Sequence, residues 1–193
     1  MTEITGDLRR YLQESRDRIV SALDGLSEYD IRRPLTPTGT NLLGLVKHLA
    51  GNEFGYLGDS VGRPAPVTLT WYEDNSVWDG ADMWATADQS RAELLDLYRL
   101  AWRHSDESIE QLGVDAPASV AWWPEQRRRT TLGSLVVRMI AETACHAGHA
   151  DIVRELIDGR GGEDHDELGG AEYWEPYVAG IQAAADRHRL ANP

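Results

Sequence analysis

The chain has 193 residues, of which 41% are hydrophobic, and this is enough for one domain with a substantial core. Its 32 acidic and 19 basic residues give a net charge of -13, so we exclude nucleic acid and anionic membrane surfaces as partners. We expect residues 1–193 to form a single domain.

An amphipathic stripe predicts the first helix, and a breaker followed by a capping residue predicts the second. Residues 6–26 place leucine, isoleucine and tyrosine on one side and arginine and glutamate on the other. A breaker with two prolines follows at residues 33–39, after which Thr40 or Asn41 can cap a second helix over residues 41–60.

Glycines clear the surface of the second helix around His48. Each glycine inside a helix costs up to about 1 kcal/mol relative to alanine, so several of them need a reason. We expect something to come close to this face, either a packed helix or a cavity beside His48. The glycines are Gly44, Gly51 and Gly55.

A long aromatic connection then interrupts the helical pattern from about residue 58 to residue 85. Connections of this length are usually functional or poorly ordered, and the aromatic content favours order. We expect this segment either to form a wall or lid over a pocket or to plug the ends of the helices. Its large aromatic residues are Trp71, Tyr72, Trp78 and Trp84.

The segment Thr86–Gln89 has the pattern of a capping box and predicts a third helix that ends before Gly113. His104 falls on the polar side of this helix, and we expect it to be inert. Residues 114–129 are irregular. Their Val-Ala-Trp-Trp-Pro run suits a short strand or an extended arm, because Pro124 excludes a central strand.

The stretch from Thr130 to Gly159 predicts the longest helix, because apolar residues recur every three or four positions without a proline. Glu142, His146 and His149 fall on its apolar side, where burial without partners costs several kcal/mol. A bound divalent metal is one reason for such residues. Hydrogen bonds among them or to buried water are the other.

A glycine-rich turn follows, in which His165 lies between two aspartates and is expected to be solvated. A last helix is predicted from about Glu172 or Tyr177 to Leu190, with Tyr177, Ile181 and Ala184 on its inner side. The chain is therefore expected to be all-α. We predict a four-helix bundle with long connections between helices two and three and between helices three and four, plus an additional C-terminal helix.

His48 with Glu142 and His146 would supply two nitrogens and one oxygen, the ligand set of a catalytic zinc site with one open position. Glu142 and His146 are one helical turn apart, so both side chains can reach one ion. Nickel, iron or manganese could be held by the same set. His149 would be a fourth ligand, a support for a ligand or a proton carrier, and Asn52 is placed to hydrogen-bond a ligand or substrate.

An open metal site of this kind supports two chemistries. It can generate hydroxide from water for hydrolysis. It can also hold the thiol of a second molecule as a thiolate, a strong nucleophile, without a protein cysteine. A third interpretation is a non-enzymatic binding or stress protein, monomeric or a homodimer, whose inward polar residues are structural.

Cys145 is the only cysteine, which excludes an internal disulfide and a metal site made of cysteines alone. The N-terminal residues are polar and unlike a signal peptide, and no apolar run approaches the roughly 18 residues of a membrane span. We expect a cytoplasmic protein with no membrane partner.

Four segments carry a resemblance to a known family: HLAGNE at residues 48–53, DMWA at residues 82–85, WWP at residues 122–124, and MIAETACHAGHADIVRELIDG at residues 139–159. They resemble the DinB superfamily, most closely its actinobacterial branch, which includes mycothiol S-transferases. The resemblance spans nearly the whole chain and implies a four-helix bundle with a divalent metal at one end. Members commonly have a His-xxx-His pair on the fourth helix, whereas this chain has Glu-xxx-His, as does the related mycothiol-dependent maleylpyruvate isomerase.

The function implied by this resemblance is transfer of a low-molecular-weight thiol, mycothiol, to an electrophilic small molecule. The metal expected first is zinc, and nickel is the alternative. Trp71, Trp78 and Trp123 would form walls of the pocket. His149 matches a family position that supports a ligand or lines the pocket more than one that binds the metal.

Overall fold

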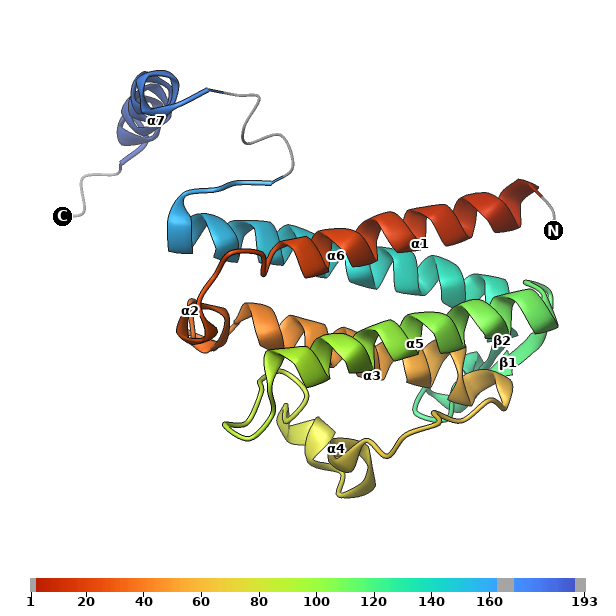
Figure 1. Ribbon diagram of the computed structural model, residues 1–193. Helices are drawn as coiled ribbons and strands as arrows, with labels where there is room; N and C mark the ends of the chain where they lie inside the picture. The colour runs from red at the N-terminus through yellow and green to blue at the C-terminus, as the bar shows by residue number, and fades with distance from the viewer. Residues whose placement is uncertain (1–2, 163–168, 190–193) are drawn as a thin grey trace.

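The computed structural model describes residues 3–162 and 169–189, and the secondary structure within them is helical apart from one two-stranded sheet. Four long helices form a bundle. Figure 1 shows α1 and α6 running side by side along one side of the molecule, with α3 and α5 along the other. This confirms the predicted all-α bundle. The helices are α1 (Glu3–Ser21), α3 (Leu42–Leu57), α5 (Arg91–Leu112) and α6 (Leu132–Asp158).

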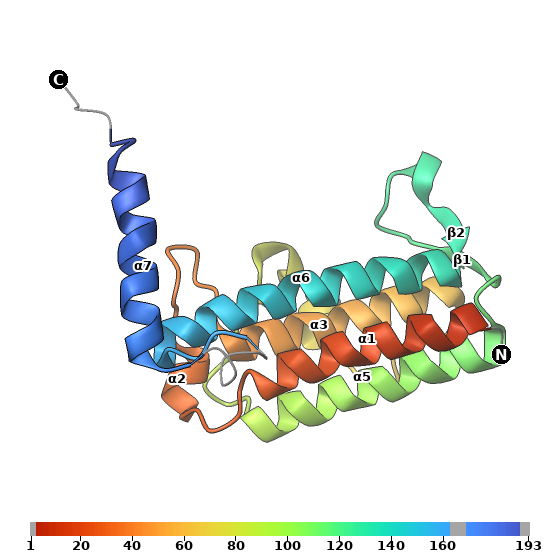
Figure 2. The same cartoon turned by 90° about the horizontal axis from the view of Figure 1, so that it is seen from above.

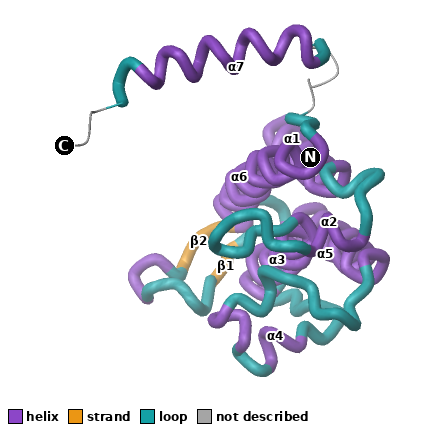
Figure 3. The backbone as a smooth tube through the Cα atoms, turned by 90° about the vertical axis from the view of Figure 1, so that its left-hand side faces the viewer, coloured by secondary structure: helices purple, strands orange, loops and turns teal. Residues whose placement is uncertain are grey.

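Short elements fill the connections between the long helices. A helix that the sequence did not indicate, α2 (Glu28–Arg32), lies between α1 and α3. The connection from α3 to α5 contains η1 (Asp59–Val61), α4 (Thr70–Glu73) and η2 (Ser76–Asp79), and Figure 3 shows it running along the outside of the bundle. Both long connections occur where they were predicted.

The connection from α5 to α6 holds the small antiparallel sheet. Its strands are β1 (Pro117–Ser119) and β2 (Arg129–Thr131), with Pro117 opposite Thr131, and η3 (Glu125–Arg127) lies between them. The strand therefore precedes the Val-Ala-Trp-Trp-Pro run, which itself forms a turn. The reason is that Val120 donates its N–H to the Arg128 carbonyl, which closes the hairpin and leaves the two tryptophans in the loop.

Helix ends follow the capping chemistry of the sequence. Thr131 caps α6 by accepting the N–H of Ser134, and Gly159 ends the helix in the left-handed conformation with a φ of 79°. The expected capping box at Thr86 is wrong. There the Gln89 side chain closes a turn by accepting the Thr86 N–H, and Ser90 with Glu93 forms the actual box of α5.

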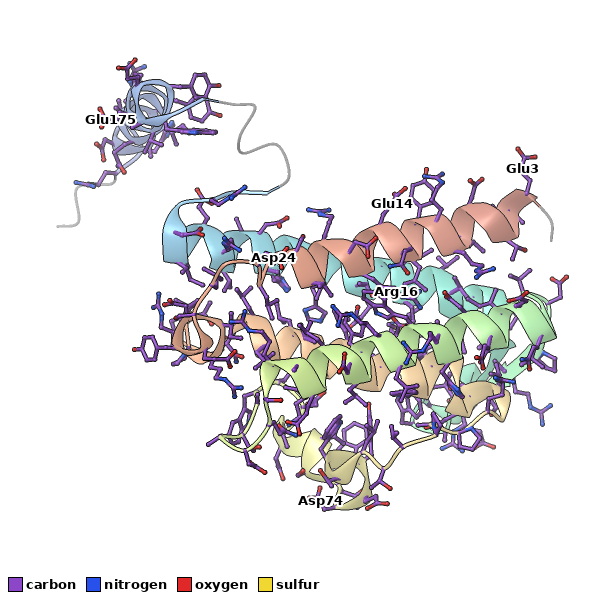
Figure 4. The ribbon with its side chains drawn as sticks, viewed as in Figure 1. Glu3, Glu14, Arg16, Asp24, Asp74 and Glu175 are labelled. Carbon is purple, nitrogen blue, oxygen red and sulfur yellow. The ribbon has the colours of Figure 1, made fainter. Side chains whose placement is uncertain are left out.

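A buried ion pair joins α1 to α3. Arg16 donates two hydrogen bonds to the Glu53 carboxylate, at 2.8 and 2.5 Å, and a third at 3.0 Å to Asp106 of α5. Both Arg16 and Glu53 have an exposed fraction of 0%. Figure 4 shows Arg16 directed into the bundle, whereas Glu3 and Glu14 on the same helix point outward. Breaking such a pair is costly, because it leaves a buried ion without its partner.

The last helix, α7 (Ala171–Asp186), has no buried residue. Figure 2 shows it beside the end of α6 and directed away from the bundle. The predicted inner side of this helix is therefore wrong. Tyr177 and Ile181 are 53% and 55% exposed, because α7 has no extensive contact with any helix of the bundle among the described residues. His165, expected to be solvated, lies outside the described residues.

Among residues 3–162 and 169–189, no helix is both long enough and apolar enough to cross a membrane.

Candidate metal centre

Three side chains from two helices converge at one point. His48 lies on α3, while Glu142 and His146 lie one turn apart on α6, and one ligand atom from each lies within 4.8 Å of the others. The Oε1 atom of Glu142 is 3.6 Å from Nε2 of His48 and 3.4 Å from Nε2 of His146. The structure thus brings together the three residues that the sequence proposed as ligands.

The burial pattern of α3 singles out the same place. Fourteen of its 16 residues are buried, and the two that are not are His48 and Asn52, one turn apart. The side chain of His48 is 17% exposed, and those of Glu142 and His146 are 27% and 15% exposed. The two partly exposed polar side chains of this otherwise buried helix both lie at the wall of a pocket described below.

Asp82 fixes the orientation of the His48 ring. Its Oδ2 atom is 2.6 Å from Nδ1 of His48, which leaves Nε2 facing Glu142. Histidines that bind metals usually donate their other ring N–H to a carboxylate or carbonyl in this way. Sequence reasoning missed this role, because Asp82 lies in a connection without periodicity. The only signal was its membership in the DMWA segment.

The charges around His48 favour a cation at this point. Burial lowers the pKa of His48, but the hydrogen bond to Asp82 and the nearby Glu142 carboxylate more than compensate and raise it to about 9. The nearby His146 and His48 rings hold the pKa of Glu142 well below its usual range. The carboxylate is therefore ionised at neutral pH, and a proton on His48 stands where a metal ion would supply positive charge.

The donor set fits a divalent ion. Two imidazole nitrogens and one carboxylate oxygen face one another, the second nitrogen of His48 is held by Asp82, and His48 and Glu142 line an open pocket. Three ligands leave coordination positions for water or substrate. The same contacts also satisfy the hydrogen-bonding alternative, in which the three side chains pair with one another.

His149 lies behind His146, on the exposed surface. Its Nδ1 atom is 3.4 Å from Nδ1 of His146, and its Nε2 atom is 4.0 Å from Sγ of Cys145. It does not belong to the converging group of three, and it does not line the pocket. Of the three roles considered for it, this position is closest to support of His146. Proton transfer by His149 stays a prediction.

A pocket of about 660 Å³ opens beside His48 and Glu142. Asn52 and Trp78 line it, as the sequence proposed, and Nδ2 of Asn52 lies 2.9 Å from Nε2 of His48. Trp71 and Trp123 do not line the pocket. The aromatic wall includes their neighbours Tyr72 and Trp122 instead, together with Tyr56.

Trp71 and Trp123 lie outside the pocket lining for different reasons. Trp71 is 5% exposed and belongs to the hydrophobic core. Trp123 supports the wall from behind, because its Nε1 atom lies 3.4 Å from the Tyr56 hydroxyl, to which Trp122 also donates at 3.3 Å. Tyr72 and Trp122 thus line the pocket, whereas their neighbours Trp71 and Trp123 pack behind it.

Arg138 is the pocket cation that sequence reasoning missed. It lines the pocket one turn before Glu142, and its guanidinium lies 3.8 Å from that carboxylate. The guanidinium also stacks over the Tyr56 ring, 4.8 Å from its centroid. An arginine on a helix surface looks solvated in a sequence, and only the aromatic loop that covers it makes Arg138 part of the site.

Comparison with known proteins agrees with this geometry. A family model described as Mycothiol-S-transferase matches residues 7–159, a range that begins in α1 and ends where α6 ends. The matched range includes His48, Asp82, Glu142 and His146. A search of curated proteins gives no match.

Proposed function

We propose that this chain, which belongs to the mycothiol-S-transferase family, transfers mycothiol to an electrophilic small molecule with the aid of a divalent ion. His48, Glu142 and His146 would hold the ion. The observation that carries the proposal is the convergence of these three side chains beside a pocket of about 660 Å³ that His48 and Glu142 line, a volume suited to a small-molecule ligand.

The chemical role of the ion would be to activate the thiol. Zinc, or nickel in the same ligand set, favours the thiolate form of a nearby thiol at neutral pH, and the thiolate is the stronger nucleophile. The protein supplies the rest. Glu142 is held ionised by its histidine neighbours, and Asp82 holds the His48 ring so that Nε2 faces the site.

The pocket would hold the two substrates beside each other. Tyr72, Trp78 and Trp122 offer aromatic faces that exclude water, and the Trp78 side chain, 71% exposed, has surface left for a ligand to cover. Asn52 and Arg138 offer hydrogen-bond donors at the same wall. Holding both reactants in one orientation is itself a large source of rate enhancement.

The transfer forms one carbon–sulfur bond. The thiol sulfur gives an electron pair to the electrophilic carbon, a leaving group departs with its bonding pair, and the thiol proton passes to water in the open pocket. His149 contacts His146 and does not line the pocket, so we assign it to support of His146, and proton transfer by His149 stays the alternative role.

Conjugate formation tests the proposal. The zinc-loaded full chain would be incubated with mycothiol and an alkyl halide, and the conjugate would be quantified by mass spectrometry. We expect Glu142→Gln to lower the rate by at least about 100-fold, because a ligand is lost. Glu155→Gln changes an exposed carboxylate on the same helix and should retain the wild-type rate.

Two results would contradict the proposal. One is a rate that is the same with Glu142→Gln as with the wild type. The other is turnover of activated esters in buffer without a thiol, together with no conjugate when mycothiol is present. That second result would favour the hydrolase alternative, because it uses the same open site with water as the nucleophile.

A further inference from the structure

The segment from Ala81 to Trp84 is fastened to the first half of α3. Asn41, the N-cap of α3, donates its side-chain N–H to the Met83 carbonyl at 3.1 Å. Gly44 comes so close that an added Cβ atom would overlap the same carbonyl oxygen. Backbone contact of this kind fixes the segment against the helix.

Lys47 holds the same segment from its other side. Its Nζ atom donates to the carbonyl oxygens of Ala81 at 2.7 Å and Trp84 at 3.0 Å, and to Oε1 of Gln89 at 3.1 Å. These three bonds use all three N–H donors of the ammonium group. Lys47 thus bridges two carbonyls that lie on either side of Asp82 and Met83 in the chain.

Lys47 is a costly residue to bury, and nothing in the packing alone calls for it. It is the only lysine of the chain and is 3% exposed. A buried ammonium is tolerated only when its donors are satisfied. Its Nζ atom also lies 4.7 Å from the centroid of the Trp71 ring, a favourable cation–π distance. All three of its hydrogen bonds go to the segment Ala81–Trp84 and to Gln89, so its burial is explained by what these contacts hold in place.

The contacts of Lys47 hold Asp82 in place. This carboxylate is 5% exposed, and the fastened segment places it 2.6 Å from Nδ1 of His48. Lys47 and His48 are consecutive residues of α3, so the lysine that holds the segment is next to the proposed ligand. We call the contacts of Lys47 with Ala81, Trp84 and Gln89 the clamp. A connected series of contacts runs from Lys47 through Ala81 and Asp82 to His48.

We propose that Lys47 is a positioning residue that acts on the ion site through Asp82. Lys47 fixes the segment Ala81–Trp84, the segment fixes the Asp82 carboxylate, and the carboxylate fixes the His48 ring. This inference rests on the proposed function for the identity of the site. Loss of such an outer partner typically weakens metal binding by about 10–100-fold.

A double-mutant cycle on zinc affinity tests this order of action. Affinity would be measured by competition with a chromophoric chelator on the full chain, for Lys47→Met, Asp82→Ala and the double variant. We expect each single variant to bind Zn²⁺ about 10-fold more weakly or worse. The double variant should bind no more weakly than Asp82→Ala, because Lys47 has nothing left to act through. Asp79→Ala, an exposed acid in the same connection, should bind as the wild type does.

Independent, multiplicative losses in the double variant would overturn the proposal, and so would wild-type affinity in either single variant. A merely structural role is separated by Asp82→Asn, which keeps an oxygen that accepts the Nδ1–H bond. We expect Asp82→Asn to bind Zn²⁺ more tightly than Asp82→Ala and to restore the visible spectrum of the Co²⁺ form. Equal losses in the two variants would assign the effect to charge and overturn positioning.

A milder variant covers the case in which Lys47→Met does not fold. Gln89→Ala removes one of the three acceptors of Lys47, and we expect a few-fold loss of zinc affinity that disappears in the Asp82→Ala background. A loss that persists unchanged in that background overturns the proposal.

Failure of the proposed function would look different. If the wild type binds Zn²⁺ but forms no mycothiol conjugate, the transfer reaction is rejected while the affinities still judge the clamp. If it binds no Zn²⁺, the His48 ring of the metal-free protein is read by long-range ¹H–¹⁵N NMR. Lys47→Met should then shift the Nδ1 signal as Asp82→Ala does, and an unshifted signal overturns the clamp.

Discussion

His48 is the residue where most interactions of the site meet. Asp82 binds one ring nitrogen, and Glu142 and Asn52 approach the other. Its pKa of about 9 means that in the metal-free protein the ring carries a proton at neutral pH. A metal ion requires the neutral ring, so metal and proton compete for the same residue.

Zinc binding should therefore release a proton from His48. Below pH 9 the proton must leave before the ion binds, so affinity should rise as the pH is raised toward 9; Glu142 contributes no proton because it is already ionised. Titration calorimetry in two buffers with different ionisation heats measures this release, expected near one proton at pH 7. Heats that do not depend on the buffer would contradict it.

The sequence predicted the three ligand candidates because they lie on helices. A period of 3.6 residues places Glu142 and His146 on one face, and glycines mark the surface around His48. Asp82 and Trp122 lie in connections, where no period relates a residue to its neighbours in space. His104 shows the opposite error. It was expected on a polar face, but it is 9% exposed and its Nε2 atom lies 2.8 Å from the Arg63 carbonyl.

At the scale of elements, the glycines of α3 have a single explanation. They were expected to admit either a helix or a cavity, and what they admit is the connections. Added Cβ atoms would overlap the Met83 carbonyl at Gly44, lie 3.0 Å from the Tyr72 hydroxyl at Gly51, and lie 3.1 Å from the Trp122 ring at Gly55. Helix α3 thus lacks side chains at the positions where Met83, Tyr72 and Trp122 of the connections contact it.

Gly44→Ala tests this packing. The added methyl group must displace the Met83 carbonyl, so we expect destabilisation on the order of 1–3 kcal/mol and weaker zinc binding. Gly148 is the matched control, since an added Cβ atom meets nothing within 4 Å there. Gly148→Ala should stabilise the chain by up to about 1 kcal/mol. Denaturant unfolding measures both, and equal effects would refute this account of Gly44.

The Arg16–Glu53 pair makes a second prediction for the elements. Glu53→Ala leaves the Arg16 guanidinium buried without its bidentate partner, so we expect a loss of about 3–5 kcal/mol in the free energy of unfolding. Replacing both residues, as Arg16→Met with Glu53→Leu, should recover much of that loss. A double variant as unstable as the single one would show that the pair has another role than mutual neutralisation.

Helix positions could be predicted because capping and breaker residues act locally. Asn41 and Gly159 mark helix ends in the sequence and in the structure. The start of α5 was misplaced by a few residues because Gln89 serves Lys47 and the Thr86 N–H instead of a helix end. That use depends on a residue about forty positions away, which no local pattern reveals.

For the whole molecule, the bundle follows from periodicity, whereas the placement of α7 does not. An amphipathic helix is expected to pack on a core, yet α7 has no buried residue and lies beyond the family match, which ends at residue 159. The apolar pattern of a helix says that it has an inner side. It does not say that a partner is present within the same bundle.

Truncation after Gly159 tests the independence of the bundle. Because the core residues all lie before this position, we expect the Tm and the zinc affinity to match those of the full chain. Thermal unfolding and chelator competition measure the two quantities. A Tm lower by more than about 5 °C would show that α7 contributes to the fold.

The central claim is that His48, Glu142 and His146 hold one divalent ion, and metal content tests it most directly. Elemental mass spectrometry would be applied after incubation with Zn²⁺ and removal of free ion, to the wild type, to His48→Ala/His146→Ala, and to the control His188→Ala, which changes an exposed histidine just after α7. We predict one ion per chain in the wild type and the control, and none in the double variant. Equal content in all three proteins, or no metal in any, would contradict the claim.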